Sequence, residues 1–312
     1  MKVNKLDHGG GLDAAIARYG GTRVDWLDLS TGVNPVAYPV DRLASDTWTA
    51  LPDTAAQEAL VGAARRFWNV PDSADILAAP GASCLIAQMP RLGAGPGCVR
   101  IDAPTYNEHA AAFAMQGWAV TTGTAEARVV VNPNNPTGAF WDGEHREGLL
   151  IIDESFCDIA PARSLIDRVG DERTVVLKSF GKFWGLAGMR LGFAIGAPAL
   201  IGRLRGWLGP WPVSGPALAV GAAALGDAGW AARTRTRLTA DADRLDALMT
   251  SAGAGIVGGT SLFRLYEVGD AARWQDRLAR HRIWSRVFPY SDTWLRLGLP
   301  APDRWDQLEA AL

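Results

Sequence analysis

A series of short apolar runs in the middle of the chain restricts the fold more than any other feature of the sequence. The runs span residues 76–79, 98–101, 128–131, 149–152, 174–177 and 191–195, and several are separated by stretches with helical periodicity. Runs without polar alternation are typical of parallel strands that are buried on both faces. The middle of the chain therefore predicts an α/β fold. Its first helix is capped by Asp53 or Thr54 and ends near Asn69.

The C-terminal part of the chain has a different pattern. A long Ala/Arg-rich helical stretch at residues 215–252 is followed by a strand at 261–268, a helix at 273–280 and strands at 283–287 and 293–297. This order predicts an α+β domain, and its arginines favour a solvated surface over a binding patch. The chain of 312 residues is long enough for about two domains.

Composition and charge exclude several classes of partner. The formal net charge is −2, so no overall positive field would attract nucleic acid or anionic lipid. The sequence shows neither the apolar core of a secretory signal nor an apolar run long enough to span a bilayer, and we expect a cytoplasmic protein. The cysteines and histidines show neither disulfide nor metal-ligand spacing, so no metal is expected. These residues are Cys84, Cys98, Cys157, His8, His109, His145 and His281.

Two motifs place polar groups at the ends of predicted strands. The segment N-P-N-N-P-T-G at residues 132–138 follows a buried run, and its prolines and glycine predict a sharp loop where α/β sheets bind ligands. The run L-L-I-I-D ends in Asp153. A buried carboxylate without a partner is costly, so we expect a cationic group opposite Asp153.

A third motif supplies a lysine in apolar surroundings. In S-F-G-K-F-W-G-L-A-G-M-R-L-G-F, Ser179, Lys182 and Arg190 lie among glycines and small residues that permit close backbone approach. Burial favours the neutral amine, which can act as a nucleophile.

Each motif also has an ordinary structural interpretation, as a turn, a helix cap or a packed lysine stem. Together they match the requirements of pyridoxal 5′-phosphate (PLP). This cofactor needs a lysine for covalent attachment, a carboxylate that keeps its pyridine nitrogen protonated, and phosphate ligands such as serine, arginine and helix-start amides.

At these motifs the sequence resembles the fold-type I PLP enzymes, the aspartate aminotransferase superfamily, from about residue 27 to 299. The resemblance implies a large domain with a mostly parallel seven-stranded sheet and a smaller α+β C-terminal domain. It places an N-terminal arm that closes the active site at 1–40, the PLP-binding domain at 41–208 and the C-terminal domain at 209–312. It also implies a homodimer.

The same resemblance assigns site residues. Lys182 would bind the cofactor covalently, Asp153 would pair with the pyridine nitrogen, and Tyr106 would stack on the ring, so these three are the expected catalytic residues. Asn135 would donate to the ring O3′ and contact the substrate. Arg296, in T-W-L-R-L-G, would bind the substrate α-carboxylate. The expected phosphate ligands are Ala82, Ser83, Ser179 and Arg190.

Two positions depart from the superfamily pattern. Phe156 stands where relatives usually have a tyrosine that donates to O3′, which leaves Asn135 as the expected donor. Leu51 stands where relatives often have a tyrosine that reaches the partner's cofactor phosphate, so that contact between subunits is in doubt.

The N-terminal segment D-H-G-G-G-L-D-A-A-I-A-R-Y-G, with W-L-D-L-S-T-G-V-N-P after it, resembles the threonine-phosphate decarboxylases of cobalamin biosynthesis. An isolated H-G-G would favour a flexible tail, but its position ahead of the second segment favours a binding role. The resemblance implies decarboxylation of L-threonine O-3-phosphate to (R)-1-amino-2-propanol O-2-phosphate. His8 and Gly9 would contact the substrate phosphate, and Gly32 and Asn34 would lie in a turn over the substrate.

Two alternatives stay open. A histidinol-phosphate aminotransferase would share the fold, the cofactor residues and a phosphorylated substrate. A catalytically inactive binding module is the other, although it would have no need for the full set of cofactor residues. The reaction cannot be chosen from the cofactor motifs alone, because PLP serves transamination and decarboxylation alike.

Overall fold

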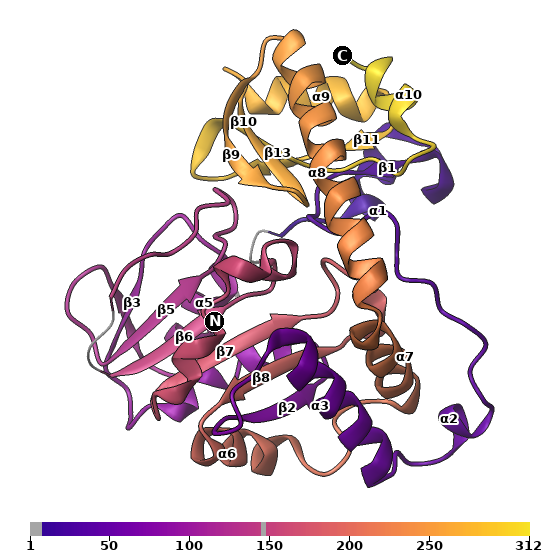
Figure 1. Cartoon of the computed structure of the whole chain (residues 1–312). Helices are drawn as coiled ribbons and strands as arrows, with labels where there is room; N and C mark the ends of the chain where they lie inside the picture. The colour runs from indigo at the N-terminus through magenta and orange to yellow at the C-terminus, as the bar shows by residue number, and fades with distance from the viewer. Residues whose placement is uncertain (1–7, 145–147) are drawn as a thin grey trace. The chain divides into compact units, whose positions relative to one another are not determined.

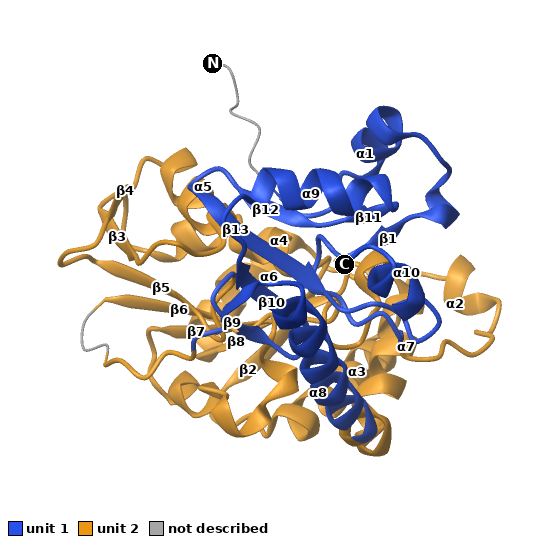
Figure 2. Cartoon of the chain, turned by 90° about the horizontal axis from the view of Figure 1, so that it is seen from above, with its two compact units in different colours: residues 1–37, 136–139, 233–312 blue, residues 38–135, 140–232 orange. Residues whose placement is uncertain are grey.

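The structure, a computed structural model, describes residues 8–144 and 148–312, so His145 lies outside the described residues. The chain forms two compact units (Figure 2). Unit 1 comprises residues 1–37, 136–139 and 233–312, and unit 2 comprises residues 38–135 and 140–232. The predicted segments 1–40, 41–208 and 209–312 stay a prediction, because a compact unit is not by itself a domain that folds independently.

Unit 2 is built on a seven-stranded sheet with strand order β2-β8-β7-β6-β5-β3-β4 (Figure 1). Only β8 runs against its neighbours, and the remaining neighbouring pairs are parallel. This confirms the predicted α/β class and the mostly parallel sheet. The strands are β2 (Asp75–Ala79), β3 (Cys98–Ile101), β4 (Ala119–Thr121), β5 (Ala127–Val131), β6 (Leu149–Asp153), β7 (Thr174–Ser179) and β8 (Gly192–Gly196).

Helices cover both faces of this sheet. On one face, alternate strand residues such as Val129, Ile151 and Leu177 form a buried core with α4 (Ala82–Ile86), α5 (Asn107–Met115) and α6 (Pro198–Leu208). The helices α3 (Thr54–Trp68) and α7 (Gly215–Gly226) pack on each other, and the short α2 (Asp46–Thr49) contacts α7. Burial on both sides explains why these strands are apolar throughout.

Helix boundaries follow local chemistry. Helix α3 begins after Asp53 and ends at Asn69, whose left-handed φ of 52° stops the helix, as the sequence predicts. The predicted helix at residues 215–252 is instead two helices, α7 and α8 (Ala228–Ser251), separated by Asp227. The Asp227 carboxylate accepts a hydrogen bond from the Trp230 N–H at 2.8 Å, so it caps the start of α8.

Unit 1 contains the four-stranded antiparallel sheet β12-β13-β10-β9 and a parallel pair, β1 with β11. This agrees with the predicted α+β pattern, except that the expected strand at 283–287 is divided between β11 and β12, which belong to different sheets. Its strands are β1 (Leu27–Asp28), β9 (Gly255–Thr260), β10 (Phe263–Glu267), β11 (Ile283–Trp284), β12 (Arg286–Phe288) and β13 (Ser291–Gly298). Its helices are α1 (Leu12–Tyr19), most of α8, α9 (Ala271–Arg280) and α10 (Trp305–Glu309).

The cysteines form no disulfide: Cys84, Cys98 and Cys157 are free, and Cys157 is buried. Among the described residues, none of the helices is both long and apolar enough to cross a membrane. Within residues 8–144 and 148–312 there is also no group of three or more His, Cys, Asp or Glu side chains that could hold a metal ion.

Candidate active site

The carboxyl ends of three neighbouring parallel strands of unit 2 carry predicted site residues. Strand β5 leads into the N-P-N-N-P-T-G loop, β6 ends at Asp153 and β7 ends at Ser179. In the ladder, Val131 pairs with Asp153 and Asp153 pairs with Leu177, so these strand ends lie side by side. Ligands in open α/β sheets bind at this edge.

Asp153 is buried and has a partner that the sequence did not predict. Its Oδ2 lies 2.8 Å from His109 Nε2, and its Oδ1 accepts hydrogen bonds from the Ser155 N–H and hydroxyl at 2.9 and 2.5 Å. An ionised carboxylate only accepts, so His109 Nε2 must carry the proton. Burial raises the pKa of Asp153, but the hydrogen bonds from His109 and Ser155 outweigh it and lower the pKa overall. The sequence predicted a cationic group opposite Asp153, and in the structure the group at that place is the imidazole of His109.

Tyr106 immediately precedes α5 and lies near the same group. Its ring is 6.1 Å from the His109 ring in an edge-to-face arrangement. Burial, followed by the charges of Glu108 and Asp153, raises the pKa of Tyr106 to about 12, although a hydrogen bond with Ser83 opposes the shift. The phenol is therefore neutral at physiological pH, and the contact with Ser83 links it to the start of α4.

Lys182 is half-buried in the loop that follows β7. Its Nζ lies 5.4 Å from the centre of the Phe156 ring. Trp184, two residues later, is fully buried and stacks between Phe180 and Trp230, with both ring centroids at 5.2 Å. Trp184 thus packs in the core, and it anchors the loop that carries Lys182.

The segment before α4 forms a narrow cradle with Arg190. Gly81 has φ 87°, and a Cβ added there would lie 2.5 Å from Arg190 Nη2. A Cβ on Gly192 would lie 2.4 Å from the Ala82 backbone nitrogen. Arg190 itself has a left-handed φ of 54° and donates to the Ala187 carbonyl at 3.0 Å. Only glycines allow the backbone and the guanidinium to come this close.

The N-P-N-N-P-T-G loop is tied to the loop before Tyr106. Asn134 accepts a hydrogen bond from the Thr105 hydroxyl at 2.6 Å and donates to the Pro104 carbonyl at 3.0 Å. Asn135, the next residue, is half-buried. Both loops are therefore held in fixed positions at the strand ends.

Unit 1 carries the predicted carboxylate ligand, Arg296, on β13. Arg296 is buried and donates to the Ser30 carbonyl at 2.8 Å. Arg286 on β12 is its direct cross-strand partner. Burial first, and the charge of Arg286 second, lower the pKa of Arg296 to about 10, so Arg296 remains a cation at neutral pH. Two like charges opposite each other destabilise a sheet unless an anion offsets them.

The N-terminal segment packs beside the Arg296–Ser30 contact. The Gly10 N–H donates to the Ser30 hydroxyl at 2.6 Å, and the His8 carbonyl accepts a hydrogen bond from Arg286. A Cβ on Gly9 would lie 2.4 Å from the Ser30 carbonyl oxygen. Hydrogen bonds thus hold the backbone of residues 8–10 against the rest of unit 1. His8 itself is exposed.

The turn predicted to lie over the substrate is also part of unit 1. Gly32 and Asn34 are buried, and the Asn34 side-chain oxygen accepts hydrogen bonds from Arg237 at 2.5 Å and from the Val36 N–H at 3.0 Å. The Asn34 side-chain oxygen is therefore hydrogen-bonded to other residues of unit 1, and these bonds stabilise the turn. A substrate contact by Asn34 stays a prediction.

Comparisons with known proteins show the family to which the chain belongs. The model of the family described as aminotransferase class I and II matches residues 122–311. The chain belongs to the class I and II aminotransferase family. It is 40% identical to a threonine-phosphate decarboxylase from a Sinorhizobium species over 95% of this chain and 93% of that protein. A threonine-phosphate decarboxylase from Pseudomonas aeruginosa is 38% identical, over 98% and 97% of the two chains.

A solved member of this fold carries a cofactor. The histidinol-phosphate aminotransferase from Sinorhizobium meliloti, in complex with PLP, superposes with a TM-score of 0.82 at 20% identity, over 97% of this chain and 94% of that one. The residues of unit 2 fit PLP. The cradle at Gly81, which a Cβ would fill, has the backbone N–H groups and the guanidinium that a phosphate needs, and the buried Asp153 is an acceptor for a protonated ring nitrogen.

Two residues of this candidate site were not predicted from the sequence, His109 and Arg286. His109 shows no metal-ligand spacing in the sequence, but it lies in the first turn of α5, three residues after Tyr106, where its Nε2 reaches Asp153. Arg286 was overlooked because nothing in its local sequence marks it. Its significance comes from the register that places it opposite Arg296.

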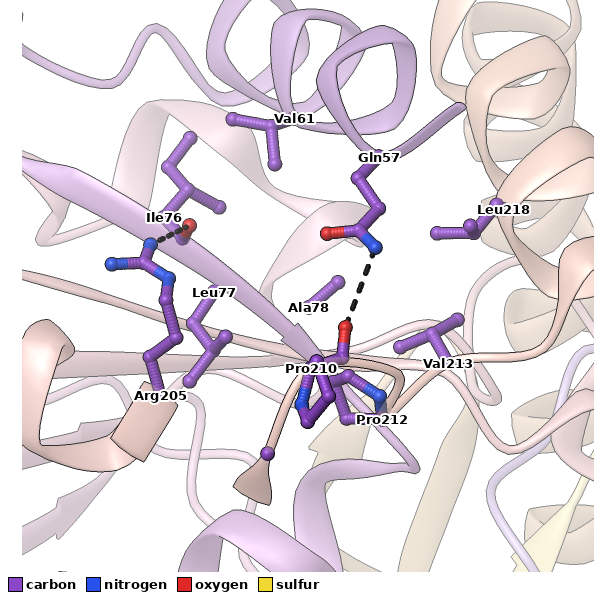
Figure 3. Close-up of a pocket in the computed structure, with 11 residues that line it drawn as sticks. Gln57, Val61, Ile76, Leu77, Ala78, Arg205, Pro210, Pro212, Val213 and Leu218 are labelled. Atoms are coloured by element: carbon purple, nitrogen blue, oxygen red, sulfur yellow. Dashed lines mark hydrogen bonds between the residues drawn. The ribbon is translucent and has the colours of Figure 1, made fainter. Parts of the chain in front are cut away.

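A cavity in unit 2 has a different location (Figure 3). It encloses about 310 Å³ beside the edge strand β2, and none of the predicted site residues lines it. Its walls are mostly apolar. Gln57 donates to the Pro210 carbonyl at 3.5 Å, as the dashed line shows, and Arg205 pairs with Asp75 at 2.9 Å. The cavity is thus not the predicted cofactor site.

Proposed function

We propose that this protein is a PLP-dependent decarboxylase that converts L-threonine O-3-phosphate into (R)-1-amino-2-propanol O-2-phosphate, the aminopropanol unit of cobalamin. The observation that carries the proposal is 40% identity to a threonine-phosphate decarboxylase along nearly the whole length of both chains. The named histidinol-phosphate aminotransferase structure shares the fold at 20% identity, which supports the fold alone.

Residues of unit 2 would hold the cofactor. Lys182 would bind it covalently, Tyr106 would cover one face of its ring, and Asn135 would donate to O3′. The proposed phosphate ligands share the cradle or lie at the end of β7, and they are Ala82, Ser83, Ser179 and Arg190. When bound, PLP supplies an electron sink for the electron pair that remains on Cα after the carboxylate leaves.

The protein side chains would control protons. Asp153, kept ionised by His109 and Ser155, would hold a proton on the ring nitrogen of the cofactor. Lys182 Nζ would deliver a proton to Cα after loss of carbon dioxide and so complete the exchange of the carboxylate for hydrogen. Both roles depend on the low-dielectric surroundings of the strand ends, where fixed charges act more strongly than in water.

Cations of unit 1 would hold the substrate anions. Arg296 would bind the α-carboxylate, and the phosphate would lie against Arg286 and the segment from His8 to Gly9, near the turn at Gly32 and Asn34. The support is the Arg286–Arg296 pair, because two cations in direct opposition suit a substrate that carries two anionic groups. A planar guanidinium can donate two parallel hydrogen bonds to either group.

The test is product formation without an amino-group acceptor. PLP-loaded protein is incubated with L-threonine O-3-phosphate in the absence of any oxo acid, and carbon dioxide and aminopropanol phosphate are measured. Equal amounts of both, absent with Lys182→Ala, are expected. L-Serine O-phosphate in parallel tests whether the methyl group matters. Glutamate formed from 2-oxoglutarate and histidinol phosphate, with no carbon dioxide from threonine phosphate, would identify an aminotransferase instead.

We also propose a cytoplasmic homodimer. Three free cysteines suit a reducing compartment. Large apolar side chains of unit 2 are exposed: Trp48 is 69% exposed, Leu51 65% and Trp211 55%. Exposed apolar surface of this kind is typical of interfaces. Light scattering at increasing protein concentration would measure the mass, and Trp48→Ser with Leu51→Ser should shift it towards 33.3 kDa.

A further inference from the structure

Glu154, the residue after Asp153, is a buried carboxylate with no part in the proposed chemistry. It is 1% exposed and accepts four hydrogen bonds. Its Oε1 accepts from Asn132 Nδ2 at 3.1 Å and from the Leu165 N–H at 2.6 Å. Its Oε2 accepts from the Ser164 hydroxyl at 2.6 Å and from Lys178 Nζ at 2.5 Å. A carboxylate has about four acceptor sites, so Glu154 is saturated.

The charge of Lys178 also interacts with that of a second carboxylate, Asp158. The Lys178 side chain is 2% exposed, and although burial opposes its charge, the neighbouring Glu154 and Asp158 raise its pKa above the ordinary value. Asp158, also buried, accepts indole N–H bonds from Trp68 at 2.7 Å and from Trp184 at 3.2 Å. This buried network therefore consists of hydrogen bonds around Glu154 and around Asp158, and the charge of Lys178 couples the two groups.

The members of this network are close neighbours, along the chain, of the predicted cofactor residues. Asn132 begins the loop that carries Asn135. Glu154 follows Asp153, Lys178 precedes Ser179, and Trp184 lies two residues after Lys182. The network therefore connects the carboxyl ends of β5, β6 and β7, which present predicted cofactor groups. None of the predicted cofactor residues is itself part of the network.

Stability alone is a poor explanation for such a pair. Desolvation of two charges roughly cancels their attraction, and apolar replacements of a buried pair are often neutral or stabilising. A buried network in which the Glu154 carboxylate is fully hydrogen-bonded does restrict the positions of the segments that it joins, because a shift of any one of them would leave a buried polar group without its partner.

From this geometry we infer that Glu154 and Lys178 are positioning residues, which hold the ends of β5, β6 and β7 in the register that binds the cofactor. The inference rests on the proposed PLP-dependent function and adds a role for residues that touch neither cofactor nor substrate.

The test compares a neutral double variant with wild type. In Glu154→Gln with Lys178→Met, the glutamine oxygen can still accept from Asn132 and Leu165, and the two charges are removed together, so the net charge is unchanged and Asp158 keeps its two indole donors. The full-length apoprotein is titrated with PLP to obtain Kd, and its thermal unfolding is followed by circular dichroism. We expect a Tm within a few degrees of wild type and a Kd for PLP at least tenfold higher.

A matched control removes an ion pair elsewhere. Arg264 and Asp246 of unit 1 form two hydrogen bonds, at 2.9 and 2.6 Å, and neither residue adjoins a predicted cofactor group in the sequence. Asp246→Asn with Arg264→Met should leave the Kd for PLP within twofold of wild type, whatever its effect on Tm. An equal loss of PLP affinity in the control would overturn the inference, since any lost ion pair would then suffice.

Two further outcomes distinguish the positioning role of Glu154 and Lys178 from the proposed PLP-dependent function. Wild-type PLP affinity in the folded double variant overturns the positioning role and leaves the proposed function intact, whereas wild-type protein that binds no PLP overturns both. If the double variant does not fold, Ser164→Ala removes one donor to Glu154 without leaving a charge. A rise in Kd of about threefold or more at unchanged Tm supports the inference, and an unchanged Kd refutes it.

Discussion

The hydrogen bond between His109 and Asp153 can be removed with little change in shape. His109→Phe keeps a ring of similar size in a fully buried position but eliminates the Nε2 donor, which lies 2.8 Å from Asp153 Oδ2. A hydrogen bond to a charged group contributes about 1.5–3 kcal/mol. Because about 1.36 kcal/mol corresponds to a factor of ten in rate, kcat/KM should fall by about 10–150-fold if the charge on Asp153 assists the chemistry.

The pKa of Asp153 determines the direction in which the pH profiles of activity and unfolding move in His109→Phe. The pKa of Asp153 is lowered in the folded protein, so the stability its charge contributes is present above the unfolded-state pKa and is lost as pH falls through the folded-state value. Without His109 the folded-state pKa rises, and the acid side of both kcat/KM and unfolding profiles should move to higher pH.

His109→Gln is the matched control, since its amide nitrogen can donate from nearly the same place. Decarboxylation is followed by carbon dioxide release from about pH 3 to 9 for wild type and both variants, because the pKa of Asp153 is lowered from an ordinary value of 3.8, and the glutamine variant is expected to remain close to wild type. A phenylalanine variant with kcat/KM within twofold of wild type and an unmoved acid limb would refute the assigned role of His109.

Three other substitutions test separate parts of the structure. Gly81→Ala places a Cβ 2.5 Å from Arg190 Nη2 at φ 87°, which costs about 1–3 kcal/mol in backbone strain, and it should weaken PLP binding by at least tenfold in a fluorescence titration. Arg286→Met should raise KM for L-threonine O-3-phosphate by about 10–150-fold through loss of a charged hydrogen bond, with the Kd for PLP unchanged. Asp227→Ala removes the cap of α8, so Tm should fall by about 2 °C with normal activity, as calorimetry and a steady-state assay would measure.

In unit 2, four of the strands that the sequence predicted, β5, β6, β7 and β8, are buried at all positions or all but one. Strand β6, for example, is buried at every position from Leu149 to Asp153. The unpredicted strands β4 and β9 are edge strands of their sheets, and Ala119, Val120 and Ile256 are exposed. β4 and β9 lack the burial that produces an apolar run, so their sequences carry little signal, and only the neighbouring strand shows where each of them pairs.

Some residues of the candidate site can also be recognised from the sequence, and others cannot. Lys182, Asp153 and Arg190 could be proposed from the sequence because a cofactor requires those residue types in short motifs, and their roles stay a prediction. His109 and Arg286 were not, because their significance depends on a helix that brings one to Asp153 and a register that brings the other to Arg296. Sequence patterns identify groups that are close along the chain, whereas contacts across the fold need coordinates.

The choice of reaction must come from the substrate ligands and not from the cofactor ligands. The groups of unit 2 that suit PLP would serve transamination as well as decarboxylation, since the cofactor stabilises the electron pair on Cα in either case. What differs is which bond to Cα is broken, and that bond must stand perpendicular to the cofactor ring. The orientation depends on where the carboxylate and the phosphate of the substrate are fixed, so Arg296, Arg286 and the segment from His8 to Gly10 would decide it. The segment from His8 to Gly10 is itself fixed through Ser30, whose carbonyl accepts from Arg296 and whose hydroxyl accepts from Gly10. A substitution in the segment from His8 to Gly10 should therefore change the ratio of decarboxylation to transamination more than it changes the affinity for PLP.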